Sequence, residues 1–151
     1  MGAVSDLAAF MRESLRIEGI HRAPTDAELS ATAEFLRRET VSVDDLVALV
    51  SVYAPGKRLR TKLNMNVRVG LYVAPKGGPQ IKSLLRAILT DVVRGEHPWH
   101  THRAYERLHP FMDGNGRSGR TLWLWQMERR YDGAPLGFLH HFYYQTLEMS
   151  T

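Results

Sequence analysis

The chain has 151 residues, of which 44% are hydrophobic, and it contains no cysteine. This length and hydrophobic content suit a single folded domain, and the lack of cysteine excludes disulfides, a thiolate nucleophile and cysteine-bound zinc. The formal net charge of +4 comes from interspersed residues of both signs and is too small to predict a nucleic-acid partner. The N-terminus lacks the apolar run of a signal peptide, and no later run is long enough to span a membrane, so we expect a cytoplasmic protein without a membrane partner.

Two amphipathic helices are predicted at the start of the chain. Residues 5–19 place apolar side chains at helical spacing, with Ser5 as N-cap and Gly19 at the end. A second helix follows Thr25, whose hydroxyl can cap it while Glu28, three residues later, completes a capping box. The apolar face expected for this second helix consists of Leu29, Ala33 and Leu36.

A third helix is followed by a change of periodicity. Ser42 can cap a helix within residues 41–56, and Pro55 and Gly56 end it. The next apolar positions alternate as in a β-strand, and they are Val67, Val69, Leu71 and Val73. Glycines and prolines directly after this run supply turn chemistry. We therefore expect one small hairpin within residues 64–79, with its turn after the alternating run.

Helical periodicity returns after the hairpin. Residues 81–95 and 98–108 have the pattern of amphipathic helices, the second with Pro98 at its first position. Residues 120–131 are apolar nearly all round, as in a helix buried at the centre of a fold. A last helix is expected within residues 134–149. Together these patterns predict an all-α fold with one hairpin.

The chemistry of the chain is concentrated in residues 109–120, HPFMDGNGRSGR. His109 is expected at the junction of a helix and a loop, because Pro110 disfavours helical geometry in the residue before it. The loop contains a tight turn whose glycines allow positive φ and close approach of the backbone. The helix that follows begins with exposed N–H groups, which form a binding site for an anion.

Four side chains of this motif fit the handling of a nucleotide. Arg117 and Arg120 are three residues apart, so both can project from one helix face and reach separate phosphate oxygens. Asp113, a hard oxygen ligand, could hold Mg²⁺ against the same phosphates. His109 is available as neutral imidazole near pH 7 and could take a proton from an attacking hydroxyl. The motif therefore combines a base, a metal ligand and phosphate-binding groups.

The motif resembles that of the Fic (Fido-domain) family, His-Pro-Phe-x-Asp/Glu-Gly-Asn-Gly-Arg-x-x-Arg, and every specified position is met. The resemblance implies a Fic-type helical bundle, with a single Fic domain over residues 1–151, that transfers AMP from ATP to a hydroxyl of a target protein. It implies that His109 is the general base, Phe111 a buried anchor and Asp113 the Mg²⁺ ligand. The residues implied to bind nucleotide are Gly114, Asn115, Gly116, Arg117 and Arg120, the last at the γ-phosphate.

A second segment, residues 64–79, is similar to the flap of Fic proteins. The flap is a hairpin that docks the target peptide by strand addition. The resemblance implies that Val67, Val69 and Leu71 contact the target protein. The partners expected are therefore ATP and a protein that offers a Ser, Thr or Tyr hydroxyl.

A third segment, SLRIEG at residues 14–19, matches the family's inhibitory pattern Ser/Thr-x-x-x-Glu-Gly/Asn. It lies in a helix expected within residues 1–22, and Ser14 and Glu18 are one helical turn apart, so both can face the same neighbour. The resemblance implies that Glu18 pairs with Arg120 and denies it the γ-phosphate. We therefore expect an enzyme that is weakly active until Glu18 moves.

Other polar and aromatic residues receive structural interpretations. Three histidines invite a metal site but lack carboxylate partners at the usual spacing, so capping or packing is preferred, and they are His97, His100 and His102. Four aromatic residues are interpreted as core, with a base-stacking surface as the alternative, and they are Trp123, Trp125, Phe142 and Tyr143. His140 and His141 point to different helix faces and receive no role. Gly119 within a helix indicates close packing or room for phosphate.

Several other functions stay open. Doc toxins resemble Fic proteins and transfer the γ-phosphate as kinases, but they carry lysine where Gly116 stands, so glycine favours AMP transfer here. Glu18 could also help water to remove AMP from a modified target. A non-catalytic nucleotide-binding module, such as one half of a toxin–antitoxin system, would not need both His109 and Asp113. A nucleic-acid-binding domain ranks last, and the sequence does not decide whether the chain forms a homo-oligomer.

Overall fold

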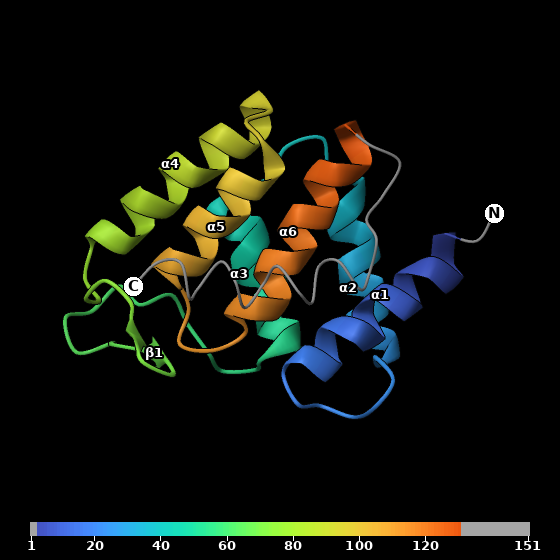
Figure 1. Cartoon of the computed structure of the whole chain (residues 1–151), viewed down its shortest axis with the longest axis horizontal. Helices are drawn as coiled ribbons and strands as arrows, with labels where there is room; N and C mark the ends of the chain where they lie inside the picture. The colour runs from blue at the N-terminus through green and yellow to red at the C-terminus, as the bar shows by residue number, and fades with distance from the viewer. Residues whose placement is uncertain (1–2, 131–151) are drawn as a thin grey trace.

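Six helices and one short hairpin make up residues 3–130, the part of the chain that this computed structural model describes (Figure 1). The elements are α1 (Ala3–Ile17), α2 (Asp26–Arg37), α3 (Val43–Tyr53), β1 (Arg68–Val69), β2 (Tyr72–Val73), α4 (Gln80–Arg94), α5 (Pro98–Leu108) and α6 (Asn115–Arg130). None of the described helices is long and apolar enough to cross a bilayer. The predicted all-α class with a small hairpin is confirmed. The predicted last helix, with His140, His141, Phe142 and Tyr143, lies outside the described residues.

The central helix of the fold is α6. It packs against α1, α2, α3 and α5, while α4 packs against α5 (Figure 1). Its middle is buried all round, as the sequence predicts, and the buried apolar residues there are Leu122, Trp123, Leu124 and Trp125. Trp125 Nε1 donates to the carbonyl of Arg38 at 2.9 Å, which satisfies the polar group of this core indole. The motif loop at the start of α6 is therefore joined to the most enclosed element of the fold.

Two capping boxes fix where α2 and α3 begin. Thr25 Oγ1 accepts from the N–H of Glu28 at 3.1 Å, and Glu28 Oε1 accepts from the N–H of Thr25 at 2.8 Å. Ser42 and Asp45 form the same reciprocal pair at the start of α3. Both predicted N-caps are confirmed, and each replaces hydrogen bonds that the first turn of a helix cannot make internally.

Two details of the first helices differ from the predictions. The helix α1 begins at Ala3, so Ser5 lies inside its first turn and is not the N-cap. The buried face of α2 consists of Glu28, Thr32 and Phe35, and the predicted Leu29, Ala33 and Leu36 are only partly buried. The hydroxyl of Thr32 forms a hydrogen bond of 2.5 Å with that of Tyr53, so the helix face that carries Thr32 is directed towards α3. Apolar spacing alone therefore placed the face of α2 one residue too late.

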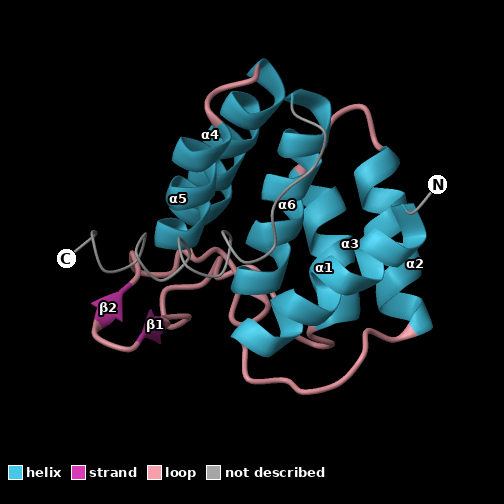
Figure 2. Cartoon of the chain, turned by 45° about the vertical axis from the view of Figure 1, so that its right-hand side comes forward, coloured by secondary structure: helices cyan, strands magenta, loops and turns pink. Residues whose placement is uncertain are grey.

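The hairpin is shorter than predicted and turns in a different place. It lies beyond the end of α5 (Figure 2). The register pairs Arg68 with Val73 and Val69 with Tyr72. The chain reverses at Gly70 and Leu71, inside the alternating run, so the predicted turn at residues 74–79 is wrong. Gly70 has a φ of 58°, which suits a two-residue hairpin turn and interrupts a strand that alternation alone would continue.

Candidate active site

His109 ends α5 in a conformation that is rare for a residue with a side chain. Its φ is 49°, and no other non-glycine residue within residues 3–130 has a positive φ. Its N–H donates to the carbonyl of Tyr105 at 3.0 Å and so closes the last turn of α5. Pro110 follows and prevents the helix from continuing. The predicted place of His109 at a helix–loop junction is confirmed.

The imidazole of His109 is held in one tautomer. Its Nδ1 lies 2.7 Å from the carbonyl oxygen of Glu106, which can only accept, so Nδ1 carries the proton and Nε2 carries the lone pair. Burial lowers the pKa of His109 from its ordinary value and the nearby charge of Arg60 lowers it too, whereas the hydrogen bond to Glu106 opposes this. His109 is therefore a neutral base at pH 7.

The motif loop is closed by the side chain of Asn115. Its Oδ1 accepts from the N–H of Phe111 at 2.8 Å, and its Nδ2 donates to the carbonyl of Phe111 at 2.7 Å. The ring of Phe111 is 0% exposed, so the loop is held by polar contacts and by the core together. Phe111 is a buried anchor, as predicted. The amide of Asn115 is engaged in the loop, which leaves its backbone N–H as the group available to an anion.

The start of α6 faces a cleft of about 420 Å³. Its wall includes Glu18 from the end of α1, Val67, Arg68 and Val69 from the hairpin, and His109, Asp113 and Gly116 from the motif. Gly114 turns the chain into α6 with a φ of 82°. The first N–H groups of a helix lack internal partners and carry the positive end of its dipole. An anionic ligand in this cleft would therefore lie next to the base.

Asp113 is the carboxylate of the motif that could hold a cation. It is exposed, it lines the cleft, and its Oδ1 accepts from the N–H of Gly114 at 2.8 Å. Within the described residues, no group of three or more His, Cys, Asp or Glu side chains could hold a metal ion alone. Mg²⁺ is commonly bound by one or two carboxylates together with substrate phosphates. The residues therefore fit a Mg²⁺ that arrives with a nucleotide.

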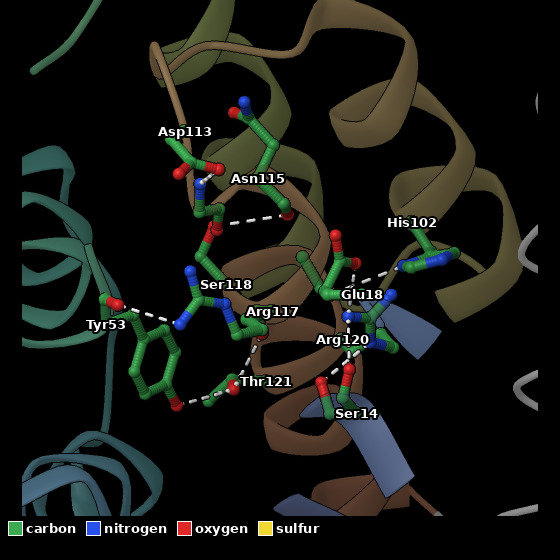
Figure 3. A network of polar contacts seen from close by, with 12 residues as sticks. Ser14, Glu18, Tyr53, His102, Asp113, Asn115, Arg117, Ser118, Arg120 and Thr121 are labelled. Carbon is green, nitrogen blue, oxygen red and sulfur yellow. Dashed lines mark hydrogen bonds and ion pairs between the residues drawn. The ribbon is translucent and has the colours of Figure 1, made fainter. Parts of the chain in front are cut away.

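Arg120 is bound by Ser14 of α1 and by Glu18, the residue that follows α1. Its Nε donates to Ser14 Oγ at 2.7 Å, and its Nη2 donates to Glu18 Oε2 at 2.7 Å and to the carbonyl of Ser14 at 3.0 Å (Figure 3). The side chain of Arg120 is 0% exposed, whereas that of Glu18 is 32% exposed. The predicted contact between Glu18 and Arg120 is therefore present, with the arginine buried and the carboxylate open to the cleft.

Two glycines of α6 leave room for neighbouring carboxylates. A Cβ on Gly116 would overlap Glu18 Oε2 and lie 3.1 Å from Arg120 Nη1. A Cβ on Gly119 would overlap Glu106 Oε1 and lie 2.9 Å from the ring of Tyr105. Gly119 thus serves close packing, one of its two predicted roles. A side chain at position 116 would displace Glu18 Oε2 from its present position.

Arg117 points away from Arg120, towards α3. Its Nη1 donates to the carbonyl of Tyr53 at 2.7 Å, and its guanidinium carbon lies 5.8 Å from the centre of the Tyr53 ring (Figure 3). It is buried and does not line the cleft. The expectation that both arginines project from one face is therefore wrong. The 60° between positions 117 and 120 is enough to direct the two side chains to different neighbouring helices.

The hairpin borders the cleft with two of the three predicted flap residues. Val67 and Val69 line it, whereas Leu71 stands at the turn and is 95% exposed. Tyr72 Oη donates to the carbonyl of Arg107 at 2.6 Å and so ties the hairpin to α5. Ile17 of α1 packs against Val69 and Tyr72. The hairpin therefore contacts α1 at its last residue, directly before Glu18.

The histidines of α5 have structural roles. His97 caps the helix, because its Nδ1 accepts from the N–H of Trp99 at 3.2 Å. His102 is buried, stacks on the ring of Trp99 and places Nδ1 3.3 Å from the carbonyl of Gly119. Burial lowers the pKa of His102 to about 3. Capping and packing are confirmed for these two, and His100 lies beside His97 with 5.1 Å between ring centres.

Two further arginines near the site gave no signal in the sequence. Arg68 lines the cleft from β1. Arg60 is 0% exposed, and its guanidinium donates to carbonyl groups of α5 and of the hairpin. Both belong to a basic segment, residues 57–68, that has no helical periodicity to separate buried from exposed charges. Only the tertiary structure distinguishes them.

No curated protein matches the chain, but a model of one protein family does. The family model described as Fic/DOC family matches residues 17–127. The matched region includes the hairpin, α5, the motif loop, most of α6 and Glu18, and it begins after Ser14. The protein belongs to the Fic/DOC family.

Proposed function

We propose that this protein transfers AMP from Mg²⁺-ATP to a hydroxyl side chain of a target protein. The observation that carries the proposal is the buried, neutral His109, which has an unprotonated Nε2 and lines the same cleft as the first residues of α6. A site that only binds nucleotide does not need a base in a fixed tautomer. Membership of the Fic/DOC family supports the same chemistry.

Each group of the site has its own role in the proposed reaction. His109 Nε2 takes the proton of the target hydroxyl as its oxygen forms a bond to the α-phosphorus of ATP. The bond from that phosphorus to the oxygen leading to the β-phosphate breaks, and pyrophosphate leaves with the electron pair. The N–H groups at the start of α6 stabilise the negative charge on the phosphates. His109 later returns its proton to solvent or to pyrophosphate.

Asp113 is the proposed ligand for Mg²⁺. Its carboxylate is exposed at the cleft, four residues from His109. The ion would screen the phosphate charges and help to orient them. Arg68, in the same wall, adds a positive charge that favours an anionic ligand.

In this proposal, the contact of Glu18 and Ser14 with Arg120 is the inhibited state of the enzyme. Glu18 and Ser14 accept hydrogen bonds from Nε and Nη2 of Arg120, which is the proposed partner of the γ-phosphate. Productive binding of ATP requires Glu18 to leave, and its 32% exposure allows this without unfolding the core. A lysine at position 116, as in the Doc proteins, would overlap Glu18. The glycine therefore favours AMP transfer with autoinhibition over γ-phosphate transfer.

The test follows the label from ATP. The protein, Glu18→Gly, and Glu18→Gly with His109→Ala are each incubated with Mg²⁺ and either α-labelled or γ-labelled ATP in a lysate. We expect protein-bound α-label that rises in Glu18→Gly and falls at least 100-fold in the double variant, as loss of a general base predicts. Glu13→Gly is the matched control, because Glu13 lies in the preceding helix α1 and pairs with the exposed Arg16, at 3.7 Å, instead of with Arg120.

Each other outcome has a defined meaning. Label that arrives only from γ-labelled ATP would replace the proposal with kinase activity. Loss of label from a target that was first modified with AMP would indicate the reverse, hydrolytic reaction. Nucleotide binding without any transfer in the three proteins would leave a binding module as the function.

A further inference from the structure

Arg60 is a fully buried cation that is bound by backbone oxygens. Its side chain is 0% exposed, and within residues 3–130 it is part of no ion pair. Its Nε donates to the carbonyl of His109 at 2.6 Å, and its Nη2 donates to the carbonyl of Leu108 at 2.7 Å. Its Nη1 donates to the carbonyls of Met65 at 3.0 Å and Pro75 at 2.7 Å. One guanidinium thus donates to four backbone carbonyls.

The four acceptors belong to two parts of the active site. Leu108 and His109 are at the C-terminus of α5, where carbonyls lack internal partners and the helix dipole favours a cation. Met65 and Pro75 flank the hairpin, one before β1 and one after β2. Arg60 therefore connects the backbone of the proposed base directly to both ends of the segment that would dock the target.

Backbone pairing reinforces this connection. The N–H of Arg60 donates to the carbonyl of Pro110 at 2.9 Å, and its carbonyl accepts from the N–H of Gly78 at 2.8 Å. Leu59 and Phe111 form an isolated antiparallel bridge beside it. The left-handed conformation of His109 is strained for a residue with a Cβ and persists only where neighbours enforce it. The hydrogen bond from Arg60 acts on the carbonyl of that same residue.

We propose that Arg60 is a positioning residue that sets the distance and direction between His109 and the target hydroxyl docked on the hairpin. This inference rests on the proposed AMP transfer. A rigid link of this kind matters because misplacement of a reacting group by about 1 Å can cost 100-fold in rate. Lysine cannot replace it, because an ammonium lacks the planar fork that reaches both pairs of carbonyls.

The experiment compares Arg60→Lys and Arg60→Met in the Glu18→Gly background, with Arg58→Met as the matched control. Arg58 is in the same segment and is exposed. Turnover and KM are measured with α-labelled ATP and the lysate protein that Glu18→Gly labels, ATP affinity by titration, and folding by thermal unfolding. We expect Arg60→Lys to fold and to lose 10- to 100-fold in kcat with ATP affinity unchanged, while Arg58→Met keeps the parent's kcat.

A second readout does not depend on activity. Arg60 lowers the pKa of His109 by its charge, whereas Glu18 and Asp113 raise it. Since all variants lack Glu18 and keep Asp113, an NMR titration of the His109 ring isolates the effect of Arg60. Arg60→Met should raise the pKa of His109, and Arg60→Lys should leave it near the parent's value despite the lower kcat. That pattern separates lost geometry from lost charge.

The outcomes that overturn the inference are distinct from those that overturn AMP transfer. Unchanged kcat in Arg60→Lys, or failure of both variants to fold, would show that Arg60 serves general stability only. If the parent transfers no α-label, the proposed function fails, and the NMR titration still tests the link to His109. In that case, a His109 titration in Arg60→Met that matches the parent's would overturn the link as well.

Discussion

The motif loop and the hairpin border the same cleft but are built in opposite ways. In the loop, the Phe111 ring is 0% exposed, and the amide of Asn115 closes the backbone from both sides. In the hairpin, each strand has two residues, and the side chain of Leu71 is 95% exposed. Groups that perform chemistry must hold one geometry, whereas a surface that receives a partner can remain open. The cleft thus joins a fixed wall, the motif loop, to an open one, the hairpin.

The largest expected contrast is in stability. Phe111→Ala should lower the free energy of unfolding by about 3–5 kcal/mol, because a fully buried aromatic ring is replaced by a cavity. Leu71→Ala should change it by less than about 0.5 kcal/mol, because the side chain is already in water. Chemical denaturation monitored by circular dichroism measures both. Similar losses in the two variants would contradict the contrast between a fixed wall and an open one.

The sequence predicts the starts of α2 and α3 and the fixed wall well, because their signals are local. The caps at Thr25 and Ser42, the positive φ after the motif's Asp113 and the break at Pro110 each depend on chemistry within a few residues. The motif itself predicts that His109, Asp113 and Gly116 gather at the cleft. The pair of Glu18 and Arg120 is 102 residues apart in sequence, and only the family pattern pointed to it.

The sequence fails where a tertiary neighbour decides the outcome. Arg117 and Arg120 have the same side chain on one helix, yet the carbonyl of Tyr53 draws one away from the cleft. The hairpin turns at Gly70 because of its φ, which alternation of apolar residues does not encode. Arg60 is buried by contacts with the end of α5, 48 and 49 residues away, and with Pro75, 15 residues away, while only Met65 is near in sequence.

The second prediction compares a buried histidine of α5, His102, with the exposed histidine that caps this helix, His97. The pKa of His102 is about 3 in the folded protein because the ring is desolvated, and it is about 6.5 in the unfolded chain. As the pH falls, the unfolded chain therefore binds a proton at His102 before the folded protein does. Burial of the neutral ring costs no stability above pH 6.5, and the free energy of unfolding decreases as the pH falls from 6.5 towards 3. The loss is at most about 1.4 kcal/mol per pH unit for one proton.

Stability of the wild type and of His102→Gln as a function of pH measures this effect. The wild type should lose stability more steeply than His102→Gln between pH 6.5 and 4. His97→Gln is the control, because His97 is exposed and only caps α5. Parallel curves for the wild type and His102→Gln would show that burial of His102 does not drive acid sensitivity.

The third prediction concerns the contact of α1 with the fixed wall. Ser14→Ala removes the hydroxyl that accepts from Arg120 Nε and leaves the ion pair of Glu18 in place. A hydrogen bond to a charged group contributes roughly 1.5–3 kcal/mol, so transfer of α-label should rise about tenfold or more, though less than in Glu18→Gly. Ser30→Ala on the exposed side of α2 is the control. Equal activity of Ser14→Ala and the wild type would mean that Glu18 alone maintains inhibition.

The smallest effect is expected where the open wall is attached to the fixed one. Tyr72→Phe removes the hydrogen bond to the carbonyl of Arg107 and keeps the ring that packs against Ile17. An exposed hydrogen bond is worth about 0.5–1.5 kcal/mol, so KM for the target should rise two- to tenfold in the Glu18→Gly background. The kcat and the affinity for ATP should stay constant, because neither His109 nor the start of α6 touches this bond.

Val73→Ala, on the exposed side of β2, should leave KM unchanged. A drop in kcat instead of a rise in KM would show that the hairpin positions the base, and the two walls would then act as one unit.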